Sequence, residues 1–150
     1  SLEREVSHDA LTGVGSRIAL NRCFEELETE RDYTLVLLDL DDFKQINDQL
    51  GHLSGDEVLR YVGKLLNETP EFMHAYRFGG DEFCLVLKQP QSEEPEVMLR
   101  RLQNQFSQRM MDLFPQFPMT LSLGIHRQQP GESALQCFRH ADEALYAAKG

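Results

Sequence analysis

Apolar residues recur along the chain with two different spacings, and each spacing predicts one kind of element. In five segments they lie three and four residues apart, which is typical of an amphipathic helix. In four shorter segments they form compact runs bounded by polar residues or glycine, which is typical of a strand. We expect helices at about residues 16–30, 42–49, 54–66, 95–113 and 133–149, and strands at 33–42, 74–76, 84–87 and 120–126.

The order of these elements predicts the fold class. One helix precedes the pattern β-α-β-β-α-β and one follows it. The pattern matches the ferredoxin-like α+β plan, an antiparallel sheet with helices on one face. The first and third strands are the central pair in that plan, so the end of YTLVLLDLDD (33–42) should lie beside RFGGDEF (77–83). The unbroken apolar run at 33–38 indicates a strand buried on both faces.

Three local signals predict where elements begin and where the chain turns. Ser16 is placed to cap the first helix. Ser54, with Glu57 three residues later, has the spacing of a capping box and predicts a helix start. Gly79 and Gly80 separate two apolar runs, which predicts a tight hairpin of the mirror type, since glycine adopts the required positive φ without strain.

Length and composition indicate one domain with an ordinary core, since the chain has 150 residues and a hydrophobic fraction of 41%. No apolar run approaches the roughly 20 residues of a membrane span, and no signal-peptide pattern opens the chain. The opening SLEREVSHD lacks an initiator methionine and is typical of the end of a charged helix. We interpret residues 1–8 as the end of an N-terminal linker helix and residues 9–150 as the domain.

Charge and cysteine usage narrow the partners and the compartment. The net charge of −10 disfavours a nucleic-acid polymer, because phosphate backbones are bound by an excess of Lys and Arg. Cys23, Cys84 and Cys137 are scattered without CxxC spacing, which argues against a disulfide framework and against a zinc site. We expect small buried side chains in the reducing cytoplasm, although a full-length protein could still be membrane-anchored.

Acidic residues gather at the two places that the expected fold brings together. Asp39, Asp41 and Asp42 end the first strand, and Asp81 and Glu82 follow the glycine pair. Carboxylates this close repel one another unless a cation neutralises them. Oxygen ligands suit Mg²⁺ or Mn²⁺, with water and nucleotide phosphate completing the shell. Two alternatives stay open: acids that begin a helix, at Asp41 and Asp42, and a merely solvated acidic turn.

Five blocks in order resemble the GGDEF family, the diguanylate cyclase domain. They are DALTGVGSR (9–17), DLDDFKQINDQLGHLSGD (39–56), RFGGDEF (77–83), SLG (122–124) and ADEALYAAK (141–149). The resemblance covers nearly the whole chain and implies a nucleotide-cyclase-like palm. It also implies that two GTP molecules are condensed into cyclic di-GMP, with release of two pyrophosphates, between two domains that face each other in a homodimer.

The same resemblance implies the metal ligands and the catalytic acid. Asp39, the backbone carbonyl of Leu40 and Asp81 resemble the ligands of the divalent metal, Mg²⁺ or Mn²⁺. Glu82 resembles additional support for that metal. Asp81 is also the expected acceptor of the proton from the ribose 3′-hydroxyl.

Substrate contacts are implied for a further group of residues, which are Lys44, Asn47, His52, Asp56, Gly79, Gly80 and Lys149. Asn47 and Asp56 resemble the pair that reads guanine, because a carboxylate can accept hydrogen bonds from N1–H and the exocyclic amine. Lys44 resembles the catalytic lysine that steadies phosphate charge, and Lys149 a second phosphate contact. His52 resembles another substrate contact, and the two glycines should let phosphate approach the backbone closely.

Simpler interpretations of these residues also stay open. Asp56 could be an ordinary acid in the first turn of a helix, and His52 a loop histidine that only packs. Lys44 and Lys149 could be plain surface lysines. Arg77 is as well suited to pair with a neighbouring acid as to take part in function.

The chain departs from the family pattern in places. Many members carry an inhibitory RxxD pair where this chain has Pro-Glu-Phe-Met at residues 70–73, so we expect no product inhibition through that site. Ser16 stands where the family has Asn. The chain ends at Gly150, and we expect further family residues, including a basic phosphate contact, to lie beyond it.

Two functions are therefore compatible with the sequence. The first is an active cyclase whose pairing is driven or regulated by the N-terminal region of the full-length protein. The alternative is a catalytically idle domain that binds GTP and regulates a partner; such relatives usually lose the signature acids, and Asp81 and Glu82 are both present here. An adenine-using cyclase is disfavoured by Asp56.

Overall fold

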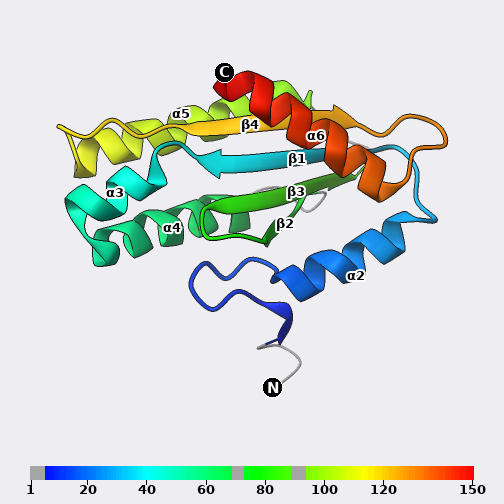
Figure 1. The fold of residues 1–150 in the computed structure, drawn as a ribbon, viewed down its shortest axis with the longest axis horizontal. Coiled ribbons are helices and arrows are strands. Elements are labelled where there is room, and N and C mark those ends of the chain that lie inside the picture. Colours follow the sequence, from blue (N-terminus) through cyan, green and yellow to red (C-terminus); the bar gives the residue numbers. More distant parts are fainter. Residues whose placement is uncertain (1–5, 69–72, 89–93) are drawn as a thin grey trace.

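A four-stranded antiparallel sheet forms the centre of the computed structural model, which describes residues 6–68, 73–88 and 94–150 (Figure 1). The strands are β1 (Tyr33–Leu40), β2 (Met73–Arg77), β3 (Glu82–Lys88) and β4 (Leu121–Arg127). Their order across the sheet is β2-β3-β1-β4, and every neighbouring pair is antiparallel. The predicted ferredoxin-like α+β fold, with β1 and β3 as the central pair, is confirmed.

Helices cover both faces of this sheet (Figure 1). They are α2 (Arg17–Leu27), α3 (Phe43–Leu50), α4 (His52–Asn67), α5 (Pro95–Leu113) and α6 (Ala134–Lys149). Val62 of α4 and Leu102 of α5 share one core cluster with Leu38 of β1, whereas Leu20 of α2 joins Leu35 in a second cluster with α6. The prediction of helices on one face therefore holds for α3, α4 and α5, since Ile46 of α3 belongs to the first cluster, but not for α2 and α6. Because β1 and β3 are apolar on both sides, α2 and α6 must cover the other face.

The alternation of side chains along β1 decides where its terminal acid points. Leu37 packs in the cluster of α2 and α6, and Leu38 packs in the cluster of α4 and α5. Because successive strand residues point to opposite faces, Asp39 leaves the sheet on the α6 side. α6 lies very close to β4 there, since a Cβ atom added to Gly124 would overlap the backbone of α6 at Ala141.

The first helix begins where the sequence predicts but ends earlier. Ser16 is the N-cap of α2, and its hydroxyl accepts a hydrogen bond from the N–H of Ala19 at 3.2 Å. The helix ends at Leu27 rather than near the predicted Glu30. The chain must turn into β1 at this point, and it does so through Asp32, whose φ of 60° lies in the left-handed region.

The helix start predicted at Ser54 is wrong. α4 begins at His52, directly after Gly51, which separates it from α3. Gly51 has a φ of 89°, a conformation that glycine adopts without strain, and the chain reverses there into the new helix. Ser54 therefore lies inside the first turn of α4. A capping box is found instead at α6, where the hydroxyl of Ser133 accepts from the N–H of Gln136 and the N–H of Ser133 donates to Oε1 of Gln136.

The hairpin at the glycine pair is present, but its turn is not the tight mirror type predicted. β2 and β3 are paired as far as Arg77 and Phe83. Neither Gly79 nor Gly80 has a φ in the left-handed region. Two N–H groups of the turn donate instead to the carbonyl of Glu82, at 3.0 and 3.4 Å. These bonds close a wider loop, which needs no positive φ at the two glycines.

Some predictions fall on residues that the structure does not describe. These are residues 1–5 of the expected linker helix, residues 70–72 of the missing RxxD pair, and most of the connection before α5. Within the described residues, no helix is both long and apolar enough to cross a membrane.

Candidate functional site

The acidic residues at the end of β1 and after the glycine pair do meet. Asp39 and Glu82 are direct partners in the pairing of β1 with β3. The N–H of Leu40 donates to the carbonyl of Asp81 at 3.3 Å, which fixes the loop against the end of β1. The structure therefore brings the four predicted metal-site residues together at one end of the sheet.

The carboxylates of Asp39 and Asp81 are crowded together in this arrangement. Oδ1 of Asp39 is buried and has no hydrogen-bond partner among the described residues. Burial raises the pKa of Asp81 from 3.8 to about 6, and so does the neighbouring Asp39 carboxylate, which can accept a hydrogen bond only from the protonated form of Asp81 and repels the charged form. Two carboxylates that crowd one another in this way form a site for a proton or a cation.

Lys149, at the end of α6, supplies one positive charge to the cluster. Its Nζ donates to Oδ2 of Asp39 at 2.5 Å and lies 3.9 Å from Oδ1 of Asp41. Burial acts to lower the pKa of Lys149, but the hydrogen bond to Asp39 and the surrounding carboxylates outweigh it and raise the pKa. The lysine covers only one oxygen of Asp39 and leaves the other without a donor.

Asp41 has a different environment from Asp39. Thr120 and Ser122 both donate their hydroxyl groups to it, each at 2.6 Å. The carboxylate is thus tied to β4 and does not complement the N-terminus of α3. Asp42 does stand at the N-cap of α3, with a φ of 57°, but its side chain makes no capping hydrogen bond.

The donor set fits a hard divalent cation. It comprises the unpartnered Oδ1 of Asp39, the carboxylate of Asp81 that resists ionisation beside it, and the neighbouring main chain at Leu40. All candidate ligands are oxygens, which Mg²⁺ and Mn²⁺ prefer. A divalent cation would remove the like-charge repulsion and satisfy the buried oxygen. The side chain of Glu82 is exposed and folds back over Gly79, where an added Cβ would overlap its carboxylate.

Arg77 braces the loop that presents Asp81. Its Nη1 lies 3.2 Å from Oδ2 of Asp9, and its Nε and Nη2 donate to the carbonyl of Gly80 at 3.1 and 2.7 Å. Asp9 also accepts two hydrogen bonds from Thr12, at 2.9 and 2.7 Å. Burial acts to raise the pKa of Asp9, but the bonds from Thr12 and Arg77 outweigh it and lower the pKa.

This brace is a part of the site that the sequence analysis did not identify. The sequence is compatible with a pairing of Arg77 with a neighbouring acid, and that acid is Asp9, which lies 68 positions away in the chain, within the block 9–17. The block 9–17 resembles the family, but its sequence gives no sign that Asp9 contacts Arg77. Only the bridge between Gly15 and Tyr76, which places the block beside β2, brings Asp9 into reach.

The predicted guanine-reading residues lie at the α3–α4 elbow. The side chain of Asn47 lies so close to α4 that a Cβ added to Gly55 would overlap its Oδ1. Asp56, the next residue, is partly exposed in the first turns of α4. α3 follows directly on the end of β1 that carries Asp39 (Figure 1). The elbow and the acidic cluster therefore occupy the same end of the sheet.

The remaining predicted residues lie at this end of the sheet but outside the acidic contacts. Lys44 on α3 and His52 at the start of α4 are exposed, and no hydrogen bond or ion pair joins them to the cluster within the described part of the chain. Gly80 is exposed, and a Cβ added there would meet nothing within 4 Å. Lys44, His52 and Gly80 are therefore all accessible to solvent at this end of the sheet.

Comparisons with known proteins identify the family of the chain. The family model described as "Diguanylate cyclase, GGDEF domain" matches residues 6–150. Diguanylate cyclase DgcN of Escherichia coli (strain K12) is 37% identical over 155 residues, which cover 99% of this chain and 38% of DgcN. NbdA of Pseudomonas aeruginosa, named a cyclic di-GMP phosphodiesterase, is 33% identical over 156 residues, which cover 99% of this chain and 20% of NbdA.

A solved structure shows the same fold. The coiled coil and GGDEF domain of DgcB from Caulobacter crescentus, in complex with c-di-GMP, matches with a TM-score of 0.84 and 31% identity. The match covers 99% of this chain and 83% of that chain. The chain thus spans nearly all of a solved domain of this kind but well under half of the two curated relatives.

Proposed function

This chain belongs to the GGDEF family, and from that premise we propose that it condenses two GTP molecules into cyclic di-GMP and releases two pyrophosphates. The convergence of Asp39 and Asp81, with a buried carboxylate oxygen left without a partner, is the observation that carries the proposal. Relatives named diguanylate cyclases support the same reaction class.

The acidic residues would hold a divalent metal and accept a proton. Asp39, Asp81 and the carbonyl of Leu40 are the proposed ligands of Mg²⁺ or Mn²⁺, with Glu82 as support. A bound divalent cation would neutralise phosphate charge and favour attack on the α-phosphate. Asp81 is the proposed base for the ribose 3′-hydroxyl.

The substrate would lie between the elbow and the loop. Asn47 and Asp56 are the proposed readers of guanine, and His52 lies one turn before Asp56 on α4. Lys44 and Lys149 are the proposed partners of the phosphates. Lys149 contacts Asp39 and therefore lies close to a phosphate that binds at the metal site. Gly80 leaves the loop backbone uncovered, so that phosphate can approach it, whereas Gly79 lies under the side chain of Glu82.

Catalysis requires two copies of the domain under this proposal. Each copy would bind one GTP, and the two substrates must face each other across a two-fold axis before either ribose can attack. The specific activity of the 150-residue chain should therefore rise with protein concentration. The N-terminal region of the full-length protein would promote or regulate this pairing.

A catalytically idle, GTP-binding regulatory domain is the alternative. It is favoured by one observation, namely that NbdA, which is named for hydrolysis of cyclic di-GMP, contains a segment 33% identical to this chain. An idle domain would bind GTP through Asn47 and Asp56 and would yield no dinucleotide. The retained pair Asp39 and Asp81 weighs against it.

Incubation with GTP and Mg²⁺ at several protein concentrations, followed by chromatography of the products, tests the proposal. We expect cyclic di-GMP and pyrophosphate, with a rate per domain that increases with concentration. Asp81→Asn should abolish the product while GTP still binds, and Asp56→Ser should weaken GTP binding. Cyclisation by Asp81→Asn at the wild-type rate, or GTP binding without product at every concentration, would overturn it.

The lack of the RxxD pair predicts one regulatory property. Because residues 70–73 carry no such pair, added cyclic di-GMP should not inhibit the reaction through that site. Binding of cyclic di-GMP at micromolar affinity, at a site away from the loop of Asp81, would contradict this expectation.

A further inference from the structure

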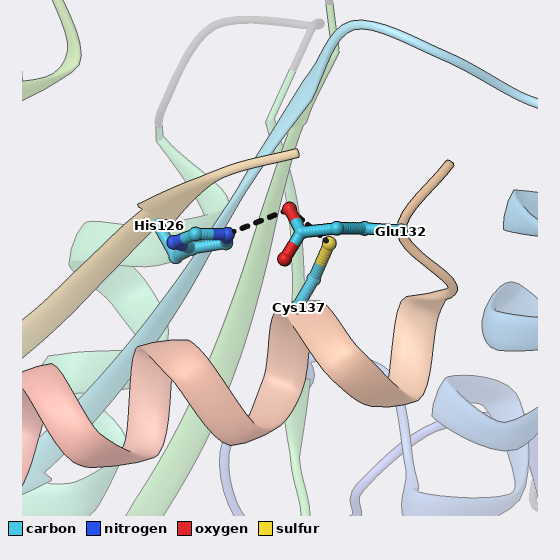
Figure 2. Close-up of side chains that lie close together, drawn as sticks. All are labelled: His126, Glu132 and Cys137. Atoms are coloured by element: carbon cyan, nitrogen blue, oxygen red, sulfur yellow. Dashed lines mark hydrogen bonds and ion pairs between the residues drawn. The ribbon is translucent and has the colours of Figure 1, made fainter. Parts of the chain in front are cut away.

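Four side chains capable of binding a transition metal converge at the start of α6. They are His126 on β4, Glu132 in the connection to α6, and Cys137 and His140 on α6 itself. Figure 2 shows the imidazole of His126 and the sulfur of Cys137 directed at the carboxylate of Glu132 from two sides. A ligand nitrogen, oxygen and sulfur from these three residues all lie within 4.8 Å of one another.

The distances are close to those that a tetrahedral metal imposes. Nε2 of His126 lies 2.9 Å from Oε1 of Glu132, and Sγ of Cys137 lies 3.9 Å from the same oxygen. In a tetrahedral zinc site, with bonds of about 2.0–2.3 Å, neighbouring ligand atoms stand about 3.3–3.7 Å apart. Small movements of side-chain ends would therefore admit an ion between the three residues.

His140 contacts the other carboxylate oxygen of Glu132, on the solvent side, and would become a fourth ligand by rotation of its side chain. Its Nδ1 lies 2.7 Å from Oε2 of Glu132, and its ring centroid lies 4.6 Å from that of His126. Cys137 and His140 are three residues apart, so they share one face of α6. The side chain of His140 is 47% exposed, whereas that of Glu132 is 14% exposed. An ion could thus enter from the side of His140.

A second layer of contacts holds the ligand atoms in place. The N–H of Gln129 donates to Oε1 of Glu132 at 2.6 Å, and the side-chain amide of Gln128 donates to the carbonyl of Glu132 at 3.2 Å. The buried hydroxyl of Tyr33 donates to Sγ of Cys137 at 3.7 Å. Outer contacts of this kind orient metal ligands and commonly account for much of a site's affinity.

We propose that His126, Glu132, Cys137 and His140 form a binding site for a borderline transition metal of the Zn²⁺ class. The mixed nitrogen, oxygen and sulfur donors suit Zn²⁺ and Co²⁺ and do not suit Mg²⁺. Bound metal would link β4 to the start of α6. The lack of CxxC spacing argues against a zinc site built from several cysteines. This site uses a single cysteine, and its other three ligands are two histidines and a glutamate.

This site is separate from the acidic cluster and does not rest on the proposed cyclase function. His126 pairs with Leu35 of β1, whereas Asp39 pairs with Ser122. Four residues of extended strand, about 13 Å, separate the two positions along β1. Both sites nonetheless contact α6, because Lys149 at its end binds Asp39.

Metal titration of the whole chain tests the proposal. Zn²⁺ is titrated against a chromophoric chelator at neutral pH with excess Mg²⁺, which occupies oxygen-only sites. Co²⁺ is then titrated in the same excess of Mg²⁺, and absorption is recorded for thiolate-to-metal charge transfer and for the intense bands of tetrahedral coordination. We expect one equivalent of either metal and a thiolate band.

Variants assign the signal to the four residues. Cys137→Ser should remove the thiolate band, and His126→Gln and the half-exposed His140→Gln should each weaken Zn²⁺ binding by about tenfold or more. The exposed His74→Gln on β2 is the control and should bind as the wild type does. Circular dichroism confirms that each variant is folded.

Two results would overturn the proposal. One is wild-type metal uptake no greater than that of the double variant His126→Gln/Cys137→Ser, which would leave the four residues as a hydrogen-bonded network only. The other is a thiolate band that survives in Cys137→Ser, which would place the metal at another cysteine.

Discussion

Replacing Asp81 with asparagine should stabilise the metal-free protein while removing the proposed activity. The reason is the crowding of the Asp81 and Asp39 carboxylates, which raises the pKa of Asp81 from 3.8 to about 6. Asparagine keeps the size of the side chain and removes its charge. The main-chain bond from Leu40 to residue 81 does not depend on the side chain and should persist.

The magnitude follows from the same pKa. A rise from 3.8 to about 6 corresponds to at most about 3 kcal/mol of lost stability at pH 7. Because the Asp81 side chain is partly exposed, solvent screening reduces this to about 1 kcal/mol. For a chain of 150 residues, about 1 kcal/mol changes the melting temperature by roughly 2–4 °C.

The effect should depend on pH with a defined sign. The folded state holds the proton of Asp81 more tightly than the unfolded state, so the cost of ionisation is absent below about pH 4 and is complete above about pH 6. Wild type and Asp81→Asn should therefore melt alike near pH 4 and diverge as the pH rises. The variant should be the more stable of the two at pH 7.5.

Thermal unfolding of the wild type and of Asp81→Asn, once in chelator and once in excess Mg²⁺, measures this difference in stability. In chelator at pH 7.5 the two melting temperatures should differ by the full amount. Mg²⁺ should stabilise the wild type more than the variant and so reduce the difference between the two melting temperatures. Asp142→Asn, an exposed acid on α6, is the matched control and should show no comparable dependence. An Asp81→Asn protein that is less stable than the wild type in chelator at pH 7.5 would refute the reasoning.

Three further substitutions probe the supports of the site. Arg77→Ala should lower kcat by about 10- to 100-fold with little change in KM, because the loop loses its brace; steady-state kinetics with unchanged kcat would contradict this. Gly55→Ala should raise KM for GTP about tenfold by displacing Asn47, the loss of roughly one hydrogen bond, and an unaltered KM would remove Asn47 from the guanine site. Gly124→Ala should cost about 1–3 kcal/mol in urea unfolding because α6 must move away from β4; an unchanged unfolding midpoint would argue against that contact.

The long periodic segments could be predicted because burial alone decides them. The helix predicted at 95–113 has those bounds as α5, and the apolar run from Tyr33 is the central strand β1. The order of elements then left one plausible sheet, and this is why the end of β1 and the glycine-pair loop could be expected to meet. The neighbouring positions of Asp39 and Glu82 follow from that topology.

Features that depend on single backbone angles or distant side chains could not be predicted. The capping pattern at Ser54 was overridden by Gly51, whose φ of 89° starts α4 earlier. The glycine-pair turn takes a wider form, with the guanidinium of Arg77 held between the loop carbonyl and Asp9. No short motif signals a contact between residues so far apart in the chain.

The cluster at the start of α6 could not be predicted for the same reason. His126 and Glu132 are brought to Cys137 by the connection between β4 and α6, and their spacing matches no zinc motif. The three cysteines are free and buried, as the sequence predicts. Burial alone, however, does not reveal which of them faces potential metal ligands.

The most direct test of the central claim is a count of Mn²⁺ bound at the end of β1. Free Mn²⁺ is measured by electron paramagnetic resonance at pH 7.5 in the presence of 3′-deoxy-GTP, which lacks the attacking hydroxyl. Wild type, Asp39→Asn and the control Asp142→Asn are compared at equal nucleotide concentration. We predict that the wild type and the control remove Mn²⁺ from solution beyond what the nucleotide alone binds, and that Asp39→Asn does not. Equal binding by all three proteins would contradict the claim that these carboxylates hold the metal.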